Sequence, residues 1–454
     1  MESGAETLPR SRRRPSGAEP ELPPGPGWTL AGSTIRWWRR PLEVLERARE
    51  RYGDVFTLRV AHEDTWVMLS DPEHVKQVFT GDPRLLHAGE ANTILLPVVG
   101  DRSVLLLDEG AHMRERKLML PPFHGKRMQR YGELMAEIAA AEIERWPKDR
   151  KLRMRPRMQA VTLEVILRAV FGVADNERLR RFRHELRTLL EAISDPRRAI
   201  LPVLLGPERI RRFPPFRRKM EKVDGLLFEE VAARRRAGDL EQREDILSLL
   251  LQARDDDGEP ISDPQLRDEL MTLLVAGHET TATALAWAIE LLARHPAQLE
   301  RLESELAAGE DEYLDAVIKE TLRLRPVVAL VLRHLTEPME IGGHLIPAGV
   351  ALAPCIYLVH RRPDVYPEPE RFRPERFLEG QDKTGARTYT WIPFGGGVRR
   401  CLGGAFAEFE MAVVLRELIR RRRIRPASDR AEHPVRRTIT NVPSRGGEVF
   451  AGPR

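Results

Sequence analysis

The chain has 454 residues, of which 42% are hydrophobic and 31% are charged, so it contains enough apolar sequence for a large core and is unlike a disordered protein. Its 74 basic and 69 acidic residues are interleaved, so the net charge of +5 indicates solvated surfaces and argues against a nucleic-acid partner. With only two cysteines, Cys355 and Cys401, a disulfide framework is excluded and a reducing compartment such as the cytoplasm is expected.

The first forty residues are rich in Pro, Gly, Arg and Ser. We therefore expect a flexible segment over residues 1–40, followed by a single domain over residues 41–454. The segment lacks a long apolar run, so neither a signal peptide nor a transmembrane anchor is predicted. Trp37 and Trp38, followed by two arginines, leave open a weak peripheral contact with a membrane.

The patterns that follow predict a mainly α protein with small β-sheets. Residues 41–52 form an expected helix that ends at Gly53, and alternating apolar residues at 56–60 and 66–69 predict a hairpin. From residue 71 to residue 325 the periodicity is mostly helical, and strand-like patterns return after Pro326.

A helix is expected to begin near Gly110. His112 and Arg116 are four residues apart, so they share one face of this helix and can hold the same anionic group. An ordinary solvated basic face is the alternative interpretation.

The longest predicted helix runs from Asp263 to Arg294, about 45 Å at 1.5 Å per residue. Its centre carries His278 and Glu279, which makes a membrane span costly and favours a buried central helix. A zinc-protease motif is excluded by spacing, because the second histidine would have to stand at position 282, where the chain has Ala282.

The middle of this helix combines small residues with an acid and a hydroxyl. Ala276 and Gly277 leave room for a ligand, and Glu279 with Thr280 can pass protons to it. The alternative is a threonine that only bonds back to its own helix.

Two further segments provide charges that can pair. Glu320 and Arg323 lie three apart on one helix face, and Arg376 follows some fifty residues later. Since a lone pair of this kind is common on exposed helices, it is weak evidence without the segments around it.

The most informative segment surrounds Cys401. Glycines at 395, 396, 397 and 403 allow close backbone approach, and the helix predicted from Ala405 points its positive end toward the thiol. These surroundings favour a thiolate that binds a metal, and Arg399 can bind a carboxylate nearby. A glycine-rich turn with a buried free thiol is the alternative. By contrast, Cys355 lies in an apolar run and is predicted to be a core residue.

This run fills every defined position of Phe-x-x-Gly-x-Arg-x-Cys-x-Gly and resembles the haem-binding signature of the cytochrome P450 superfamily, soluble bacterial type. The resemblance implies the cytochrome P450 fold, a single haem-thiolate domain over residues 41–454 and a long central helix over the haem. It implies haem b (iron protoporphyrin IX) with Cys401 as metal ligand. The haem-binding residues that it implies are His112, Arg116, Arg333, Phe394, Gly397, Arg399, Cys401 and Gly403.

It also implies that Glu279 and Thr280 are the catalytic residues of oxygen activation. Glu320, Arg323 and Arg376 would form a buried structural triad. The expected pocket walls are aliphatic and lack a charged anchor, which indicates a hydrophobic small-molecule substrate. They are Leu95, Leu96, Val98, Leu273, Ala276, Val327, Val328 and Leu330.

The function expected from the resemblance is a monooxygenase that inserts one oxygen atom of O₂ into an apolar substrate, in a monomeric protein. Electrons would come from NAD(P)H through a ferredoxin or flavodoxin with its reductase. Arg399 and Arg400, with residues 420–423 and Arg425, are the candidate docking face. A peroxide-driven peroxygenase and a non-catalytic haem sensor or ligand-binding protein are the alternatives.

Overall fold

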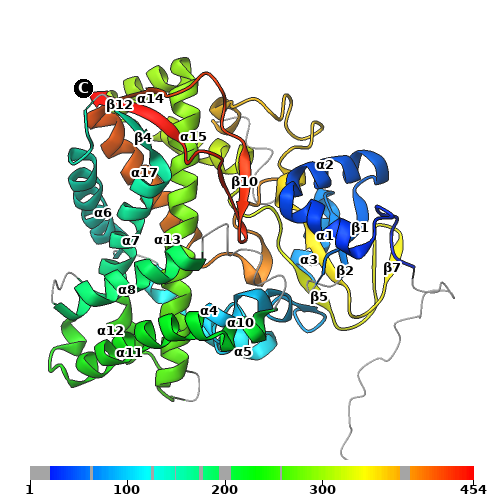
Figure 1. Ribbon diagram of the computed structural model, residues 1–454, viewed down its shortest axis with the longest axis horizontal. Helices are drawn as coiled ribbons and strands as arrows, with labels where there is room; N and C mark the ends of the chain where they lie inside the picture. Colours follow the sequence, from blue (N-terminus) through cyan, green and yellow to red (C-terminus); the bar gives the residue numbers. More distant parts are fainter. Residues whose placement is uncertain are drawn as a thin grey trace, which may run out of the picture.

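The computed structural model describes residues 21–61, 65–123, 127–148, 150–172, 177–193, 206–255, 258–378 and 389–454. Most of these residues belong to a large helical region around α13 (Asp263–Arg294). A smaller region with most of the strands lies to the right of α13 in Figure 1. The predicted architecture, mainly α with small sheets, is confirmed.

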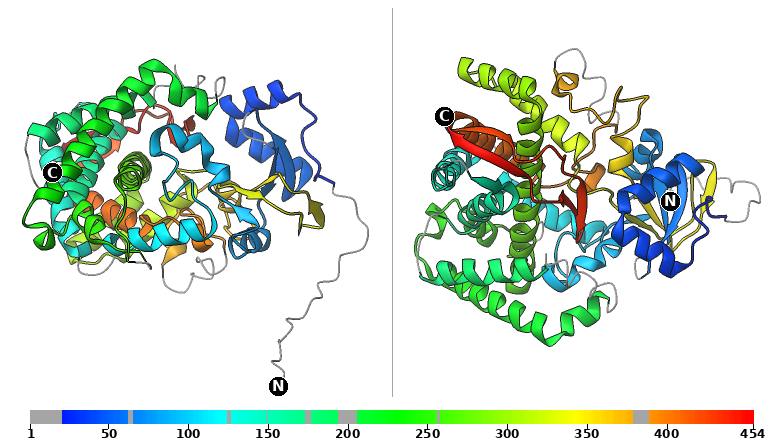
Figure 2. Two further views of the ribbon diagram at one scale, coloured as in Figure 1. Left: turned by 90° about the horizontal axis from the view of Figure 1, so that it is seen from below. Right: turned by 45° about the horizontal axis from the view of Figure 1, so that its top comes forward.

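Helix α13 forms the axis of the helical region. It packs along α7 (Met154–Phe171), while α17 (Gly404–Arg421) packs along α6 (Arg127–Glu144) and also touches α13. The left view of Figure 2 looks along α13 and shows other helices around it. Almost every residue in the C-terminal half of α13 is buried, as expected of a helix inside a core.

The other helices cover this core. Their bounds are α8 (Glu177–Ile193), α10 (Pro207–Arg212), α11 (Pro214–Arg236), α12 (Ile246–Gln252), α14 (Pro296–Ala308) and α15 (Glu312–Leu324). Three further helices are α4 (Leu96–Val99), α5 (Glu109–Met119) and α16 (Ile356–Val359).

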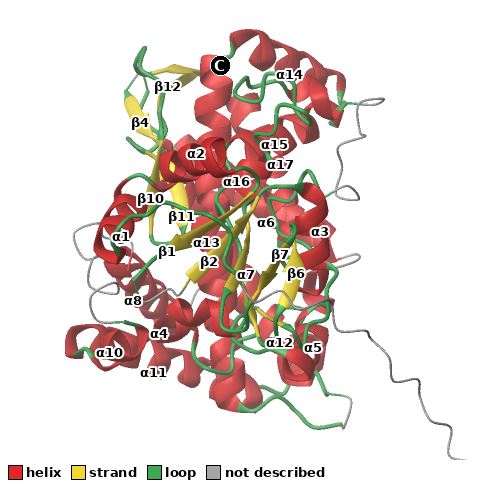
Figure 3. Ribbon diagram, turned by 90° about the vertical axis from the view of Figure 1, so that its right-hand side faces the viewer, coloured by secondary structure: helices red, strands yellow, loops and turns green. Residues whose placement is uncertain are grey.

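The largest sheet has five strands in the order β1-β2-β8-β5-β3. Its strands are β1 (Val55–Arg59), β2 (Thr65–Leu69), β8 (Ala351–Pro354), β5 (Arg333–Leu335) and β3 (Leu86–His87). The predicted hairpin is the antiparallel pair β1–β2, and β2 pairs in parallel with β8. Figure 3 shows this sheet with α1 (Leu30–Arg39), α2 (Pro41–Tyr52) and α3 (Pro72–Phe79) around it. The sheet therefore joins residues 55–87 with residues 333–354, which are far apart in the sequence.

Three small sheets complete the fold. They are β4 (Lys151–Arg153), β12 (Glu448–Pro453) and β9 (Arg422–Pro426); β10 (Pro434–Arg437) and β11 (Thr440–Pro443); and β6 (Met339–Ile341) and β7 (His344–Ile346).

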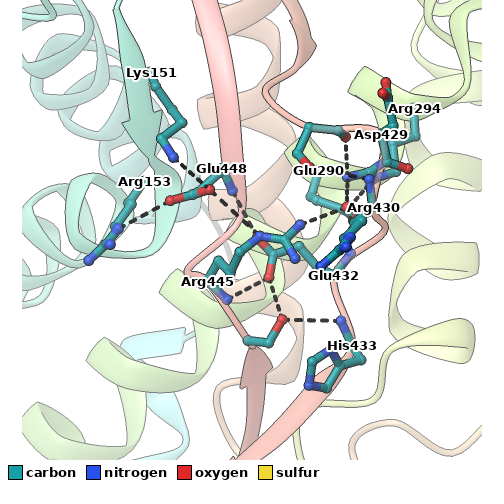
Figure 4. A network of polar contacts seen from close by, with 12 residues as sticks. Lys151, Arg153, Glu290, Arg294, Asp429, Arg430, Glu432, His433, Arg445 and Glu448 are labelled. Carbon is teal, nitrogen blue, oxygen red and sulfur yellow. Dashed lines mark hydrogen bonds and ion pairs between the residues drawn. The ribbon is translucent and has the colours of Figure 1, made fainter.

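A polar network near the C-terminus ties the sheet of β4, β12 and β9 and the segment before β10 to α13 (Figure 4). The buried carboxylate of Glu432 accepts the N–H groups of Arg445, at 2.6 Å, and of Glu448, at 3.1 Å. Glu290 on α13 accepts the N–H of Glu432 at 3.3 Å. Because both carboxylates are buried and hydrogen-bonded, they fix the last strands to the C-terminal end of α13.

The expected flexible segment of residues 1–40 contains structure in its last part. Residues 1–20 lie outside the described residues, whereas Leu30–Arg39 forms α1. Trp37 is 4% exposed and packs edge-on against Trp66, with 5.2 Å between ring centroids. The Trp37 ring is thus a core residue and cannot make the membrane contact suggested by the sequence. Among the described residues no helix is long and apolar enough to span a membrane.

Candidate functional site

The cysteine predicted to bind a metal lies between a short 3₁₀ turn, Gly397–Arg399, and the start of α17. Its N–H donates to the carbonyl of Phe394 at 3.0 Å, and that of Gly395 donates to the carbonyl of Ile392 at 3.0 Å. Gly397 has a φ of 65°, and a Cβ there would stand 1.9 Å from the carbonyl oxygen of Phe79. Glycine is therefore required at position 397 by both conformation and space.

The thiol of Cys401 is reachable although it lies deep among protein atoms. Cys401 is exposed, whereas Cys355 is buried. The deep surroundings of Cys401 raise the pKa of its thiol, while the N–H of Gly403 and the guanidinium groups of Arg116 and Arg400 lower it. Cys355 differs, since complete burial raises its pKa to about 12 and keeps it a neutral core residue.

Four cationic or potentially cationic groups gather beside this loop. His112 and Arg116 come from α5, Arg333 from β5 and Arg399 from the cysteine loop, so three segments far apart in sequence meet here. Burial first, then repulsion by its neighbours, lowers the pKa of Arg399 and of Arg333 to about 10 and that of His112 to about 4. A bound anion relieves this repulsion, so the cluster suits a ligand that carries carboxylates.

Asp108 is the acidic residue next to this basic cluster, and its carboxylate already has hydrogen-bond partners within the protein. It pairs with Arg399 and accepts the N–H groups of Ala88, at 2.9 Å, and Gly89, at 2.8 Å. Arg399 also donates to the carbonyl of Val104 at 3.2 Å. The Val104 N–H in turn donates to Glu269 on α13 at 2.6 Å. The segment between α4 and α5 therefore links the cysteine loop to the central helix.

The small residues in the middle of α13 include one that is not covered by protein atoms. Ala276 is exposed although most of the helix is buried. The hydroxyl of Thr280 donates to the carbonyl of Ala276 at 2.6 Å, which is the local bond expected of a threonine within a helix. This bond leaves the hydroxyl oxygen able to accept another hydrogen bond.

Glu279 is held by two residues of α7. Its carboxylate lies 2.5 Å from Nη2 of Arg155 and 2.6 Å from Nε2 of Gln159. Sequence reasoning missed both partners, because more than a hundred residues separate them from Glu279 and no local pattern marks them. Glu279 therefore forms an ion pair with a mostly buried guanidinium.

The structure brings together the predicted triad. Glu320 and Arg323 are fully buried, and two bonds of 2.6 and 2.9 Å join them. Nε of Arg376 donates to the same carboxylate at 3.1 Å, and so does the N–H of Arg373 at 2.8 Å. One acid thus neutralises two buried cations, and removing it strands both.

The predicted pocket residues divide between two environments. Leu95 and Leu96 are half-buried, while Val98 and Leu273 pack against the main helical core. Val327 is buried and its carbonyl accepts the N–H of Asn441 at 2.8 Å, and Val328 is half-buried beside it. Leu330 packs instead against the separate cluster around Trp37 and Phe56, at the sheet.

The basic residues proposed as a docking face do not form one patch. Arg422 is buried and donates to the carbonyl of Ile143 at 2.7 Å. Residues 420–423 stand at the far end of α17, whose 18 residues span about 27 Å. Arg400 is exposed next to Cys401 and is the basic side chain of this set nearest the thiol on the surface.

Taken together, these residues fit a haem: an exposed cysteine in a glycine loop, a cluster of basic groups beside it and an exposed Ala276 on α13. The family model described as Cytochrome P450 matches residues 22–447. The chain is 46% identical over 435 residues to the putative cytochrome P450 135B1 of Mycobacterium tuberculosis, covering 94% of this chain and 91% of that protein.

A second relative, the putative cytochrome P450 135A1 of Mycobacterium tuberculosis, is 41% identical over 433 residues, with 94% of each chain covered. Among solved structures, a retinoic acid bound cyanobacterial CYP120A1 has a TM-score of 0.82 at 25% identity, covering 96% of this chain and 100% of that chain. The cytochrome P450DA heme domain has a TM-score of 0.81 at 24% identity, covering 95% and 98%. This chain belongs to the cytochrome P450 family and has its fold.

Proposed function

We propose that this cytochrome P450 monooxygenase binds haem b through Cys401 and inserts one oxygen atom of O₂ into an apolar organic substrate. The other oxygen atom leaves as water, with electrons delivered by a separate protein. The observation that carries the proposal is the reachable thiol of Cys401 beside a cluster of His112, Arg116, Arg333 and Arg399. When bound, the haem supplies oxygen activation, which a thiolate ligand promotes by donating electron density.

Each residue of the loop has a task in this proposal. The Gly403 N–H and the positive end of α17 favour the thiolate form of Cys401 against the opposing effect of burial, and Gly397 lets the loop pack against the backbone of Phe79. The ring of Phe394 packs 6.2 Å from that of Trp391, centroid to centroid, at the start of the loop. The four basic residues hold the two carboxylates of the cofactor.

Loss of one of these basic groups should weaken haem binding. We expect Arg333→Leu to release haem about 10-fold to 100-fold faster, since a hydrogen bond to a charged group contributes about 1.5 to 3 kcal/mol. Transfer of haem to an excess of apomyoglobin measures the rate. Arg333→Lys, which keeps the charge, serves as the control, and its rate of haem release should lie between those of the native protein and Arg333→Leu. Equal rates in all three proteins would show that Arg333 does not bind the haem.

Thr280 and Glu279 would pass protons beside the exposed Ala276. The hydroxyl of Thr280 can accept a proton and donate its own, while Arg155 and Gln159 hold the Glu279 carboxylate one residue away. When Glu279 turns away from Arg155, its carboxylate can take a proton from solvent and release it toward Thr280. This acid and hydroxyl favour the O₂-dependent reaction over a peroxide-driven one.

We expect Thr280→Ala to uncouple electron use from product formation, with most electrons lost to peroxide or water. The ratio of product formed to NAD(P)H consumed measures the coupling. The neighbouring Thr281 is 3% exposed, so Thr281→Ala is a matched control that should leave the ratio unchanged. A Thr280→Ala variant as tightly coupled as the native protein would refute the proton-transfer role.

The peroxide-driven alternative makes the opposite prediction about which oxidant supports the faster turnover. Turnover with peroxide alone would then exceed turnover with O₂ and a redox chain. A sensor would form no product with either. The retinoic acid bound to the cyanobacterial relative makes that apolar acid a suitable first ligand in a screen for spin-state shifts.

We place the docking of a ferredoxin or flavodoxin at Arg400. Arg400→Glu should slow reduction of the haem several-fold at low salt and less at high salt, because screening shortens the reach of the charge. Arg420→Glu, at the far end of α17, is the matched control and should reduce at the native rate. Equal slowing by both changes would mean that the docking face extends along α17.

A further inference from the structure

Residues 390–392 immediately precede the cysteine loop, and each of them makes a hydrogen bond to a residue elsewhere in the chain. The carbonyl of Thr390 accepts the hydroxyl of Tyr366 at 3.1 Å. The indole N–H of Trp391 donates to the carbonyl of Lys319 at 3.1 Å. The N–H of Ile392 donates to Nε2 of His360 at 2.8 Å. Because these residues are buried, this segment has one fixed position relative to α15.

The groups that hold this segment rest on the buried triad. The carbonyl of His360 accepts Nη1 of Arg323 at 2.8 Å. The guanidinium of Arg323 lies 5.1 Å from the centre of the Tyr366 ring, and that of Arg376 lies 5.9 Å from it. The position of His360 is thus set by the same arginine that binds Glu320.

A short series of backbone bonds continues from Ile392 to the thiol. The carbonyl of Ile392 accepts the N–H of Gly395 at 3.0 Å, which closes the first turn of the loop. The carbonyl of Phe394 then accepts the N–H of Cys401 at 3.0 Å. A change in the peptide of Ile392 therefore moves the residue that orients Cys401.

The side chain of His360 is a hydrogen-bond acceptor that stays uncharged. Its side chain is fully buried, and burial followed by the charge of Arg323 lowers its pKa to about 3. The ring is neutral at ordinary pH, so Nε2 can accept the N–H of Ile392 and the proton resides on Nδ1. Within the described residues Nδ1 has no hydrogen-bond partner. Nε2 is therefore the ring atom through which His360 makes its hydrogen bond.

We propose that His360 is a positioning residue of the thiolate, which fixes the peptide of Ile392 and through it the placement of Cys401. The inference rests on the proposed role of Cys401 as haem ligand. It differs from a packing role, because a packing residue would alter stability without altering the sulfur as a ligand. It also links the buried triad to the cysteine loop, because Arg323 binds the carbonyl of His360 and His360 binds Ile392.

The test compares two replacements of His360 in the haem-loaded protein. His360→Leu fills similar space but leaves the Ile392 N–H without an acceptor, whereas His360→Gln offers an amide oxygen at similar reach. We expect the leucine variant to raise the ratio of thiol-type to thiolate-type spectrum in the reduced, carbon-monoxide-bound protein about 10-fold. The midpoint potential should shift with it, and glutamine should restore both values.

Tyr313→Phe is the matched control. It removes a 2.7 Å hydrogen bond from Tyr313, on α15, to Glu375 but touches none of residues 390–392. Its spectrum and potential should match the native protein. If His360→Leu does not fold, His360→Asn replaces it, because its shorter amide cannot reach Ile392.

A folded leucine or asparagine variant with the native ratio and potential would overturn the inference. So would a glutamine variant as perturbed as the leucine variant. A native protein without a thiolate-type spectrum is a separate outcome, because it would refute the proposed role of Cys401 itself.

Discussion

Replacement of Cys401 by serine is expected to abolish monooxygenase turnover while haem is still bound. The four basic residues that we propose as carboxylate partners remain in place, so the cofactor keeps most of its contacts. A serine hydroxyl does not ionise at neutral pH and donates far less electron density, so oxygen activation fails. The ratio of haem to protein, the ferric absorption spectrum and product formation together measure the effect.

The second cysteine provides the control for this experiment. Cys355 is fully buried among apolar residues, so Cys355→Ala should keep the native spectrum and turnover. If serine at position 401 retains native turnover, or if alanine at position 355 removes it, the ligand assignment is wrong.

Replacement of Glu320 by glutamine is expected to destabilise the fold strongly. The change leaves Arg323 and Arg376 buried without a counter-charge, and breaking a buried ion pair in this way costs about 3 to 5 kcal/mol. We expect low yields of haem-containing protein and a much lower midpoint in urea. Denaturant unfolding followed by far-UV circular dichroism measures the difference.

An exposed ion pair serves as the control for the triad. Glu221 pairs with Arg217 at 3.3 Å, and both side chains are about 60% exposed. Glu221→Gln should change stability by less than about 1 kcal/mol, because solvent screens such pairs. Equal losses of unfolding free energy from the two changes would show that the buried position of Glu320 does not make its charge more important for stability.

Much of the fold was predictable where the signal is local. The helix from Asp263 to Arg294 and the β1–β2 hairpin follow from periodicity and from capping or turn residues close by. The triad was predictable only because a family resemblance connected Arg376 with Glu320, since spacing alone cannot bring them together.

Other features depend on contacts that no local pattern encodes. Arg155 reaches Glu279 across 124 positions, and its own surroundings resemble any basic helix start. Trp37 appeared available for a membrane, but α1 folds back and buries it against Trp66. Arg422 appeared part of a basic surface, yet the turn from α17 into β9 directs it inward. In each case long-range packing decides whether a side chain faces solvent.

The central claim is that Cys401 binds the haem as a thiolate. The absorption spectrum of the native protein, reduced and exposed to carbon monoxide, tests it most directly. The account predicts the red-shifted Soret band of a thiolate-ligated haem as the dominant species, and its loss in Cys401→Ser. A native spectrum of the histidine-ligated or thiol-ligated type would contradict it.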